Sequence, residues 1–172
     1  MIQEVMYTEE DIRNRISDLA EEIEKFYNNK DLVVVPLLRG GFVFASDLIR
    51  RINLKLEVDF LTTSSYGNET TSSGNVSILG NLRSDIKDKH VLIVDDIIDT
   101  GNTLVEVKKH LSSFGPKDIK ICTMLDKPSR RKQNINADFV GFTIDDVFIV
   151  GYGLDYENFY RNTPYIFRFI EG

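Results

Sequence analysis

The apolar residues of this chain recur at two spacings, which separate helices from strands. Between Ile12 and Phe26 they return every three or four positions, as on one face of a helix, and Thr8 with Asp11 supplies a capping signal in front. Elsewhere the apolar residues form short continuous or alternating runs typical of strands. The predicted strands are Leu32–Leu38, Glu57–Tyr66, Asn75–Leu79, His90–Val94, Asp118–Leu125, Asp138–Phe142, Val147–Val150 and Tyr165–Ile170.

Two further helices are predicted directly after strands. One covers Phe42–Ile52 and follows a loop of Arg39, Gly40 and Gly41; the other covers Thr103–Phe114 and stops at Gly115-Pro116. Strands that alternate with helices are typical of an α/β fold with a mainly parallel sheet. We therefore expect a mainly parallel sheet flanked by helices, and the length of 172 residues favours one domain over residues 1–172.

Composition adds the expected compartment. The single cysteine, Cys122, lies in an apolar run and cannot form an intramolecular disulfide, so we expect a buried thiol and a reducing cytoplasm. The N-terminal residues show no basic segment followed by an apolar one, and no run of about 18 apolar residues occurs, so neither secretion nor a membrane span is expected.

The balance of charge argues against a nucleic-acid-binding protein. The chain carries 21 Lys and Arg against 27 Asp and Glu, a formal net charge of −6. Broad electrostatic attraction to phosphate backbones needs the opposite sign. An anionic ligand would therefore have to be held locally, by backbone N–H groups, a helix N-terminus or a bound Mg²⁺ ion.

The most informative segment is Val91–Thr103, VLIVDDIIDTGNT. A buried strand is predicted to end at Asp95 and Asp96, where the carboxyl end of a parallel strand places ligand sites. Adjacent carboxylates suit a vicinal diol or Mg²⁺. Thr100–Thr103 offers successive N–H groups at a helix start, with Gly101 allowing close approach of a phosphate. A solvated turn is the ordinary interpretation of an acidic pair alone, but the ordered set of features favours a site.

The complete segment resembles the phosphoribosyl-pyrophosphate signature of type I phosphoribosyltransferases. That resemblance implies that Asp95 and Asp96 orient ribose hydroxyls and bind Mg²⁺, and that Asp99 is the catalytic residue beside the purine. It also implies a phosphate cradle made of Thr100, Gly101, Asn102 and Thr103.

Two other families share part of these patterns. The opening letters VLIVDD resemble a response-regulator receiver domain, but too few residues follow Asp96 for the remaining βα units of that fold. Gly151-Tyr152-Gly153 resembles part of a dinucleotide loop, but it has no third glycine and no helical pattern after it.

The resemblance extends in order from about Val33 to Arg168 and points to the hypoxanthine-guanine phosphoribosyltransferases. It implies that Arg39 and Gly40 contact pyrophosphate, together with Arg161. Ser65 and Tyr66 correspond to a flexible loop that closes over the reaction centre and excludes water.

The purine-binding residues also come from the resemblance. Lys127 would donate to O6 of the base, Phe148 would stack on it, and the backbone of Ile149 would read its edge. Asp155 would lie near the base and a second Mg²⁺ ion. The resemblance also implies a small β-rich hood built from parts of the N-terminal and C-terminal segments.

The function implied is purine salvage, in which the 5-phosphoribosyl group moves from 5-phosphoribosyl-1-pyrophosphate to N9 of hypoxanthine or guanine, giving IMP or GMP and pyrophosphate. The expected partners are these two substrates, with Mg²⁺ as cofactor, and no nucleic acid or membrane. A homodimer or homotetramer is expected, since the aromatic stretch Tyr152–Phe169 offers an interface. Two alternatives stay open: a guanine- or xanthine-preferring transferase, and a phosphoribosyl-pyrophosphate-sensing regulator that binds nucleic acid.

Overall fold

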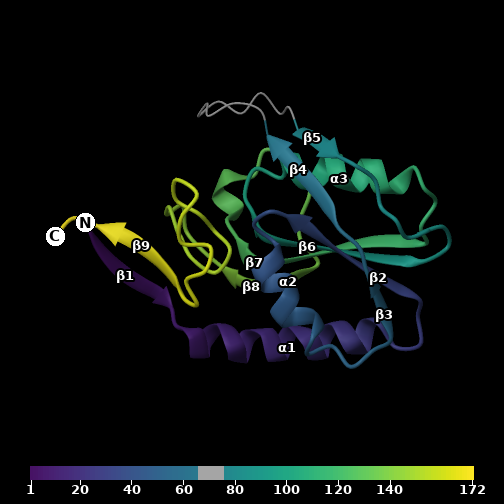
Figure 1. Cartoon of the computed structure of the whole chain (residues 1–172), viewed down its shortest axis with the longest axis horizontal. Helices are drawn as coiled ribbons and strands as arrows, with labels where there is room; N and C mark the ends of the chain where they lie inside the picture. The colour runs from purple at the N-terminus through teal and green to yellow at the C-terminus, as the bar shows by residue number, and fades with distance from the viewer. Residues whose placement is uncertain (66–75) are drawn as a thin grey trace.

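The computed structural model of the chain describes residues 1–65 and 76–172, and its centre is a mainly parallel sheet (Figure 1). Within these ranges the strand order is β5-β4-β2-β6-β7-β8, and β3 pairs separately with β2. Among the described strands of this sheet, only β4 and β5 pair in antiparallel fashion. The strands are β2 (Leu32–Leu38), β3 (Leu56–Val58), β4 (Leu61–Ser65), β5 (Val76–Leu79), β6 (His90–Ile98), β7 (Asp118–Asp126) and β8 (Phe139–Thr143). The expected α/β class is confirmed.

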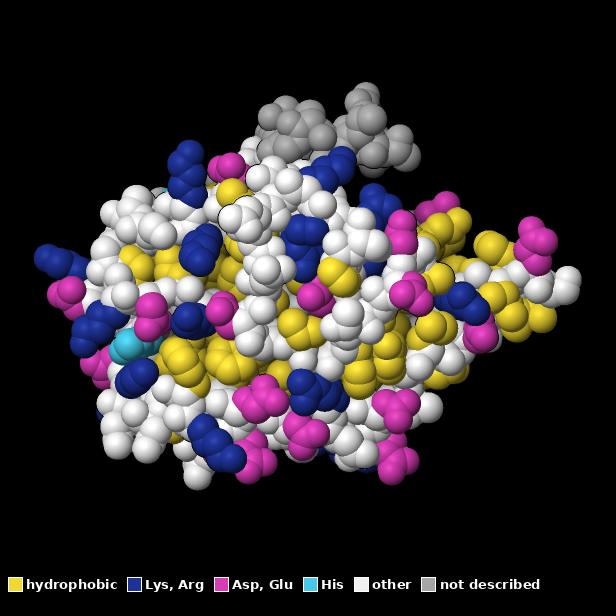
Figure 2. Space-filling view, turned by 180° about the vertical axis from the view of Figure 1, so that it is seen from behind, with side chains coloured by type: hydrophobic (Ala, Val, Ile, Leu, Met, Phe, Trp, Pro, Cys, Tyr) yellow, Lys and Arg dark blue, Asp and Glu magenta, His cyan; other side chains and the backbone are white. Residues whose placement is uncertain are grey.

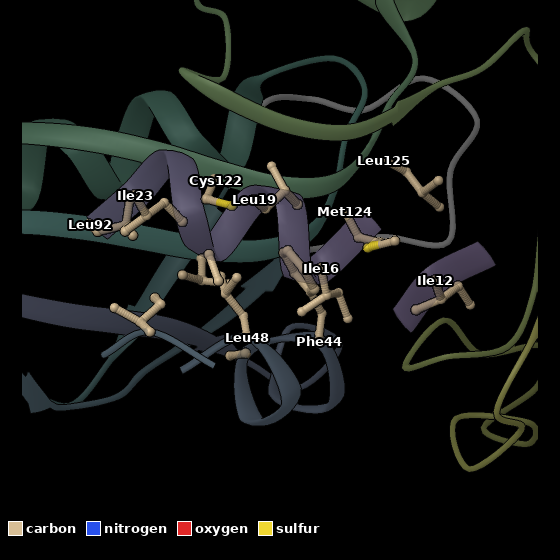
Figure 3. Packing of buried hydrophobic residues seen from close by; sticks show 14 of the residues in the cluster. Ile12, Ile16, Leu19, Ile23, Phe44, Leu48, Leu92, Cys122, Met124 and Leu125 are labelled. Atoms are coloured by element: carbon tan, nitrogen blue, oxygen red, sulfur yellow. The ribbon is translucent and has the colours of Figure 1, made fainter. Parts of the chain in front are cut away.

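Helices cover both faces of this sheet because successive side chains of β6 point to opposite sides. Leu92 and Val94 pack toward α1 (Glu9–Tyr27) and α2 (Phe42–Ile49). Val91 and Ile93 instead pack in the cluster that contains the buried side chains of α3 (Asn102–Ser112). Figure 3 shows the first of these layers, where residues of α1 and α2 meet Leu92 and the β7 side chains. The sheet is therefore buried on both sides, as parallel sheets require.

A second, two-stranded sheet extends away from the main one (Figure 1). It joins β1 (Ile2–Tyr7) to β9 (Ile166–Ile170) in antiparallel pairing, so both ends of the chain lie together. This sheet confirms the small β-rich hood that the resemblance implied, although the residue pattern did not predict a strand at Ile2–Tyr7. None of its residues is fully buried, so it carries no clear alternation of apolar and polar positions.

Several predicted boundaries were wrong. The strand expected to end at Val94 continues to Ile98, so the acidic pair lies inside β6 rather than in the loop after it. The helix expected to reach Ile52 ends at Ile49. Val147–Val150 is not a strand; only Val150 forms an isolated bridge. In α1 the buried stripe ends on Tyr27, and Phe26 is exposed.

The strand predicted over Glu57–Tyr66 is interrupted at Asp59, a buried carboxylate. Its oxygens accept hydrogen bonds from the backbone N–H groups of Phe60, Arg83 and Ser84, at 2.9, 2.6 and 2.7 Å. Burial alone would raise the pKa of Asp59, but these donors outweigh it and lower the pKa from the usual value of 3.8. Asp59 therefore fastens the chain after β5 to the sheet.

We expect Asp59→Asn to lower the free energy of unfolding by about 2 kcal/mol at pH 7, because an amide accepts these bonds less well than a carboxylate. A lowered pKa in the folded state gives stability that is present above the unfolded pKa and lost as pH falls through the folded one. The difference between wild type and variant should therefore shrink below pH 3.8. Urea unfolding across pH measures it, with Asp85→Asn, which changes an exposed acceptor, as the control. A difference that stays constant with pH would contradict the assignment.

Two further observations concern the cysteine and the helices. Cys122 is fully buried in β7, as predicted, and burial raises the pKa of its thiol. Among the helices of the described residues, none has both the length and the apolar character needed to cross a membrane.

Candidate active site

The carboxyl ends of β2 and β6 open into one pocket of about 260 Å³. Parallel pairing brings these strand ends to the same edge of the sheet, where α/β proteins place their ligands. The sequence-predicted residues that line the pocket are Arg39, Gly40, Asp95, Asp96, Asp99, Gly101, Thr103, Asp155 and Arg161. A larger cavity of about 350 Å³, between α1, α2 and the loop at Tyr152, contains none of them. Chemistry rather than size therefore identifies the candidate site.

Asp95 and Asp96 lie in the second half of β6. The carboxylate of each accepts a hydrogen bond from the backbone N–H of the next residue. Asp96 N–H donates to Asp95 Oδ1 at 2.9 Å, and Ile97 N–H donates to Asp96 Oδ1 at 2.7 Å. Burial, followed by the charge of Asp96, raises the pKa of Asp95. Burial also raises the pKa of Asp96, although hydrogen bonds and the positive charge of Arg161 oppose it. The pair is a concentrated negative centre that a cation or hydroxyl donors would stabilise.

The segment after β6 forms the predicted cradle. Gly101 has φ +85°, a left-handed conformation that favours glycine, and it is the N-cap residue of α3, so no side chain caps the helix N-terminus. Asn102 N–H donates to Thr100 Oγ1 at 3.2 Å. A Cβ on Gly101 would come within 2.5 Å of Ile135 Cγ2, so a larger residue does not fit. The successive backbone N–H groups at the start of α3 and the helix dipole suit a phosphate.

Two glycine-containing loops meet beside Asp96. The Leu38–Arg39 peptide is cis, and a Cβ on Gly40 would lie 2.1 Å from Asp96 Oδ2. A Cβ on Gly153 would lie 2.4 Å from the Gly40 carbonyl oxygen. Gly153 therefore serves close packing of two loops, a use unlike that of a dinucleotide fingerprint.

This packing brings the expected pyrophosphate-binding arginine into the pocket. Arg161 Nη1 donates to the Gly153 carbonyl at 2.6 Å, and Arg161 Nη2 lies 3.3 Å from Asp155 Oδ1. Asp155 Oδ2 also accepts from Asn158 N–H at 3.0 Å. Arg161 and Asp155 thus line the same pocket as Asp96, and the positive charge of Arg161 acts on the Asp96 carboxylate.

Three residues expected to bind a purine, Lys127, Phe148 and Ile149, are not part of the pocket lining. Lys127 nevertheless lies at the same edge of the sheet, because β7 runs parallel to β6. Lys127 follows β7; it is 8% exposed, and its Nζ lies 3.8 Å from Asp146 Oδ1. Phe148 is 61% exposed, and its ring meets Tyr156 edge to face at 5.9 Å. Ile149 is buried in the irregular segment before Val150. An exposed aromatic ring can stack on a flat base, and a buried ammonium can donate to its oxygen.

Two predicted residues of the expected flexible loop and two unpredicted residues near the site remain to be placed. Ser65 is the last residue of β4, and Tyr66 lies outside the described residues. Thr63 lines the pocket from β4, and Asp146 faces Lys127, yet neither was predicted. The sequence signal available for Thr63 was its position in a predicted strand, which decides the face of the sheet to which its side chain points. Nothing in the sequence distinguishes Asp146 from the neighbouring Asp145.

Comparison with known proteins agrees with this geometry. Residues 5–157 match the family model described as the phosphoribosyl transferase domain. The chain is 51% identical to a hypoxanthine phosphoribosyltransferase of Haemophilus influenzae, over 95% of this chain and 93% of the relative. It is 48% identical to a hypoxanthine-guanine phosphoribosyltransferase of Staphylococcus aureus, over 96% and 92% of the two chains.

Solved structures extend the likeness to three dimensions. A hypoxanthine-guanine phosphoribosyltransferase of Bacillus anthracis, with a HEPES molecule in its active site, superposes with a TM-score of 0.94 at 44% identity. The match covers 99% of this chain and 100% of that one. Fold, site and near-complete coverage agree, and the chain belongs to the hypoxanthine-guanine phosphoribosyltransferases of the type I phosphoribosyltransferase family.

Proposed function

We propose that this chain is a purine-salvage enzyme that transfers the 5-phosphoribosyl group of 5-phosphoribosyl-1-pyrophosphate to N9 of hypoxanthine or guanine, releasing pyrophosphate and IMP or GMP. One observation carries the proposal: the acidic pair, two residues of the phosphate cradle (Gly101 and Thr103) and Arg161 line a single pocket at the carboxyl ends of the strands. Relatives named for hypoxanthine or guanine transfer, at about half identity over nearly the whole chain, support the same substrates.

Different residues would bind the 5-phosphate, the ribose and the pyrophosphate of the substrate. The N–H groups of Thr100, Gly101, Asn102 and Thr103 would bind the 5-phosphate. Asp95 and Asp96 would accept hydrogen bonds from the two ribose hydroxyls, which fixes the sugar in the pocket. Arg39, Gly40 and Arg161 would face the pyrophosphate. Displacement at the anomeric carbon then proceeds with inversion, through a state with positive charge on the ribose, beside which Asp95 and Asp96 place their negative charge.

Mg²⁺ is the proposed cofactor. Among residues 1–65 and 76–172, no group of three His, Cys, Asp or Glu side chains is arranged to hold a metal ion by itself. Carboxylates of Asp95, Asp96 and Asp155 nevertheless line the pocket, and Mg²⁺ usually takes one or two carboxylates, waters and substrate phosphate oxygens. The donor set therefore fits a Mg²⁺ ion that arrives with the substrate. When bound, such an ion neutralises charge on the leaving pyrophosphate.

The remaining residues would bind the purine base. Lys127 would donate to O6, Phe148 would stack on the ring, and the Ile149 backbone would contact the edge that carries N1. Asp99 would accept the proton from N7 or stabilise it, while N9 attacks the ribose. Ser65 and Tyr66 would belong to the loop that shields the cationic ribosyl centre from water.

A substrate panel tests the proposal. The protein with Mg²⁺ and phosphoribosyl pyrophosphate is incubated with each of hypoxanthine, guanine, xanthine, adenine, uracil and orotate, and the nucleotide formed is measured. We expect IMP or GMP with hypoxanthine or guanine, and far less product with adenine, uracil or orotate. A main product from xanthine would favour the alternative transferase. No product from any 6-oxopurine would refute the proposal.

The regulator alternative is disfavoured by the surface. Figure 2 shows Lys and Arg side chains interspersed with Asp and Glu on the face drawn, without a continuous basic area. Together with the net charge of −6, this arrangement does not suit a nucleic-acid backbone. We place the enzyme in the cytoplasm, consistent with its lone buried Cys122, and propose a homodimer or homotetramer, with exposed aromatics such as Phe159 available for contact.

A further inference from the structure

The segment after β7 is fastened to the end of β6 through one largely buried arginine side chain. Arg131 Nη1 donates to the carbonyl oxygen of Asp99 at 2.7 Å, and Arg131 Nη2 donates to Asp126 Oδ1 at 2.7 Å. We propose that Arg131 is a positioning residue of the transfer reaction, which fixes the separation between Asp99 and the purine-recognising Lys127. The proposal rests on the function proposed above, because it concerns the alignment of the purine in that site.

The register of the sheet explains why a clamp is needed at this point. β6 and β7 pair in parallel as far as Ile98 with Asp126, and the next residues along the two strands are Asp99 and Lys127. Beyond that pair, Lys127 N–H still donates to the Ile98 carbonyl at 2.9 Å. The guanidinium then joins the two segments just beyond this pairing. It donates to the carbonyl oxygen of Asp99 and to the carboxylate of Asp126, the residue before Lys127.

The chemistry of the base gives this spacing its importance. N7 and O6 lie on one edge of a 6-oxopurine. Asp99 and Lys127 would therefore contact the same edge of one rigid ring, and their separation must match the separation of those two atoms. Errors of about 1 Å in such alignment can lower rates by roughly 10²-fold, even when all reacting groups are present.

Arginine suits the clamp for reasons of charge and shape. The side chains of Arg131 and Asp126 are only 13% and 15% exposed, so their ion pair is largely shielded from water. A planar guanidinium presents donors in fixed directions and can join two acceptors at once, whereas a lysine ammonium acts as a point charge on a flexible stem. Lysine at this position would keep the charge without holding both contacts.

The same segment also supports the cradle from behind. Lys132 N–H and Gln133 N–H both donate to the Thr100 carbonyl, at 2.9 and 3.1 Å. The nearest atoms to a Cβ built on Gly101 belong to Ile135, Gln133 and Arg131. The cradle thus keeps backbone contacts of its own, so loss of Arg131 should disturb the purine side more than the phosphate side.

The test compares Arg131→Met and Arg131→Lys with wild type and with Arg15→Met. Arg15 makes a similar clamp outside the pocket lining, donating to the Gly141 and Val140 carbonyls at 2.8 and 2.7 Å. Melting temperature, kcat, KM for hypoxanthine and KM for phosphoribosyl pyrophosphate are measured for each protein. Activity is recorded at a temperature where every variant assayed is folded.

For both Arg131 variants we expect kcat/KM for hypoxanthine to fall by at least about 10-fold, with KM for phosphoribosyl pyrophosphate within about 3-fold of wild type. Arg15→Met should lose stability but keep its kinetic constants. If Arg131→Met does not fold, Arg131→Lys, which keeps the buried charge, decides the matter. Wild-type kinetics in the folded variants, or equal losses for both substrates, would overturn the proposal. Inactive wild type would instead count against the proposed function, so the two failures are distinguishable.

Discussion

Replacement of Asp99 by Asn is expected to lower kcat by roughly 10²-fold or more while changing the affinity for phosphoribosyl pyrophosphate far less. The carboxylate lines the pocket between the acidic pair and the cradle. Among the described residues no hydrogen bond to its side chain occurs, which leaves both oxygens for a substrate. Asparagine keeps the size and one acceptor but loses the charge that assists departure of the N7 proton.

Single-turnover measurement of IMP formation separates this effect from product release, which limits many transferases. Binding of phosphoribosyl pyrophosphate with Mg²⁺, followed by calorimetry, shows whether the sugar site is intact. A matched control is Asp118→Asn at the opposite end of the sheet, where the carboxylate contacts His90 and faces no pocket residue. Near-normal single-turnover rates for Asp99→Asn would exclude Asp99 as the catalytic group.

The parts of the site that the sequence predicted are those whose residues are consecutive. Val91–Thr103 contains a buried strand, an acidic pair and a cradle in one run, so local pattern and local geometry coincide. The strand nevertheless continues past the acidic pair, because β7 and β6 stay paired up to Ile98. That pairing depends on residues far along the chain, and local hydrophobicity does not report it.

Residues that act through distant contacts were harder to predict. Arg131 occurs in the stretch Ser129–Gln133, whose letters SRRKQ are typical of a solvated surface loop. In the structure the side chain is largely buried, because its charge is neutralised by Asp126 and its Nη1 donates to the carbonyl oxygen of Asp99. A strand at Val147–Val150 was predicted from a run of apolar residues. Their side chains lie in different surroundings, however, since Phe148 is exposed while Ile149 and Val150 are buried.

Replacement of Lys127 by Ala is expected to relax the discrimination between hypoxanthine and adenine. An ammonium only donates, so it stabilises the O6 acceptor of hypoxanthine and opposes the 6-amino donor of adenine. Lys127 is nearly buried, and a hydrogen bond from a charged group in such a place is worth about 10- to 100-fold in binding. The value of kcat/KM for hypoxanthine should fall by about that factor, while the value for adenine stays the same or rises.

The informative quantity is the ratio of the two kcat/KM values, since a general loss of folding would lower both and leave the ratio unchanged. Lys127→Gln provides the matched variant, because an amide both donates and accepts and should give an intermediate ratio. Asp146→Asn tests the neighbouring carboxylate, which lies 3.8 Å from the ammonium. Its removal leaves the donor in place, so hypoxanthine should remain the preferred base. A wild-type ratio in Lys127→Ala would show that discrimination resides elsewhere, with the backbone around Ile149 as the next candidate.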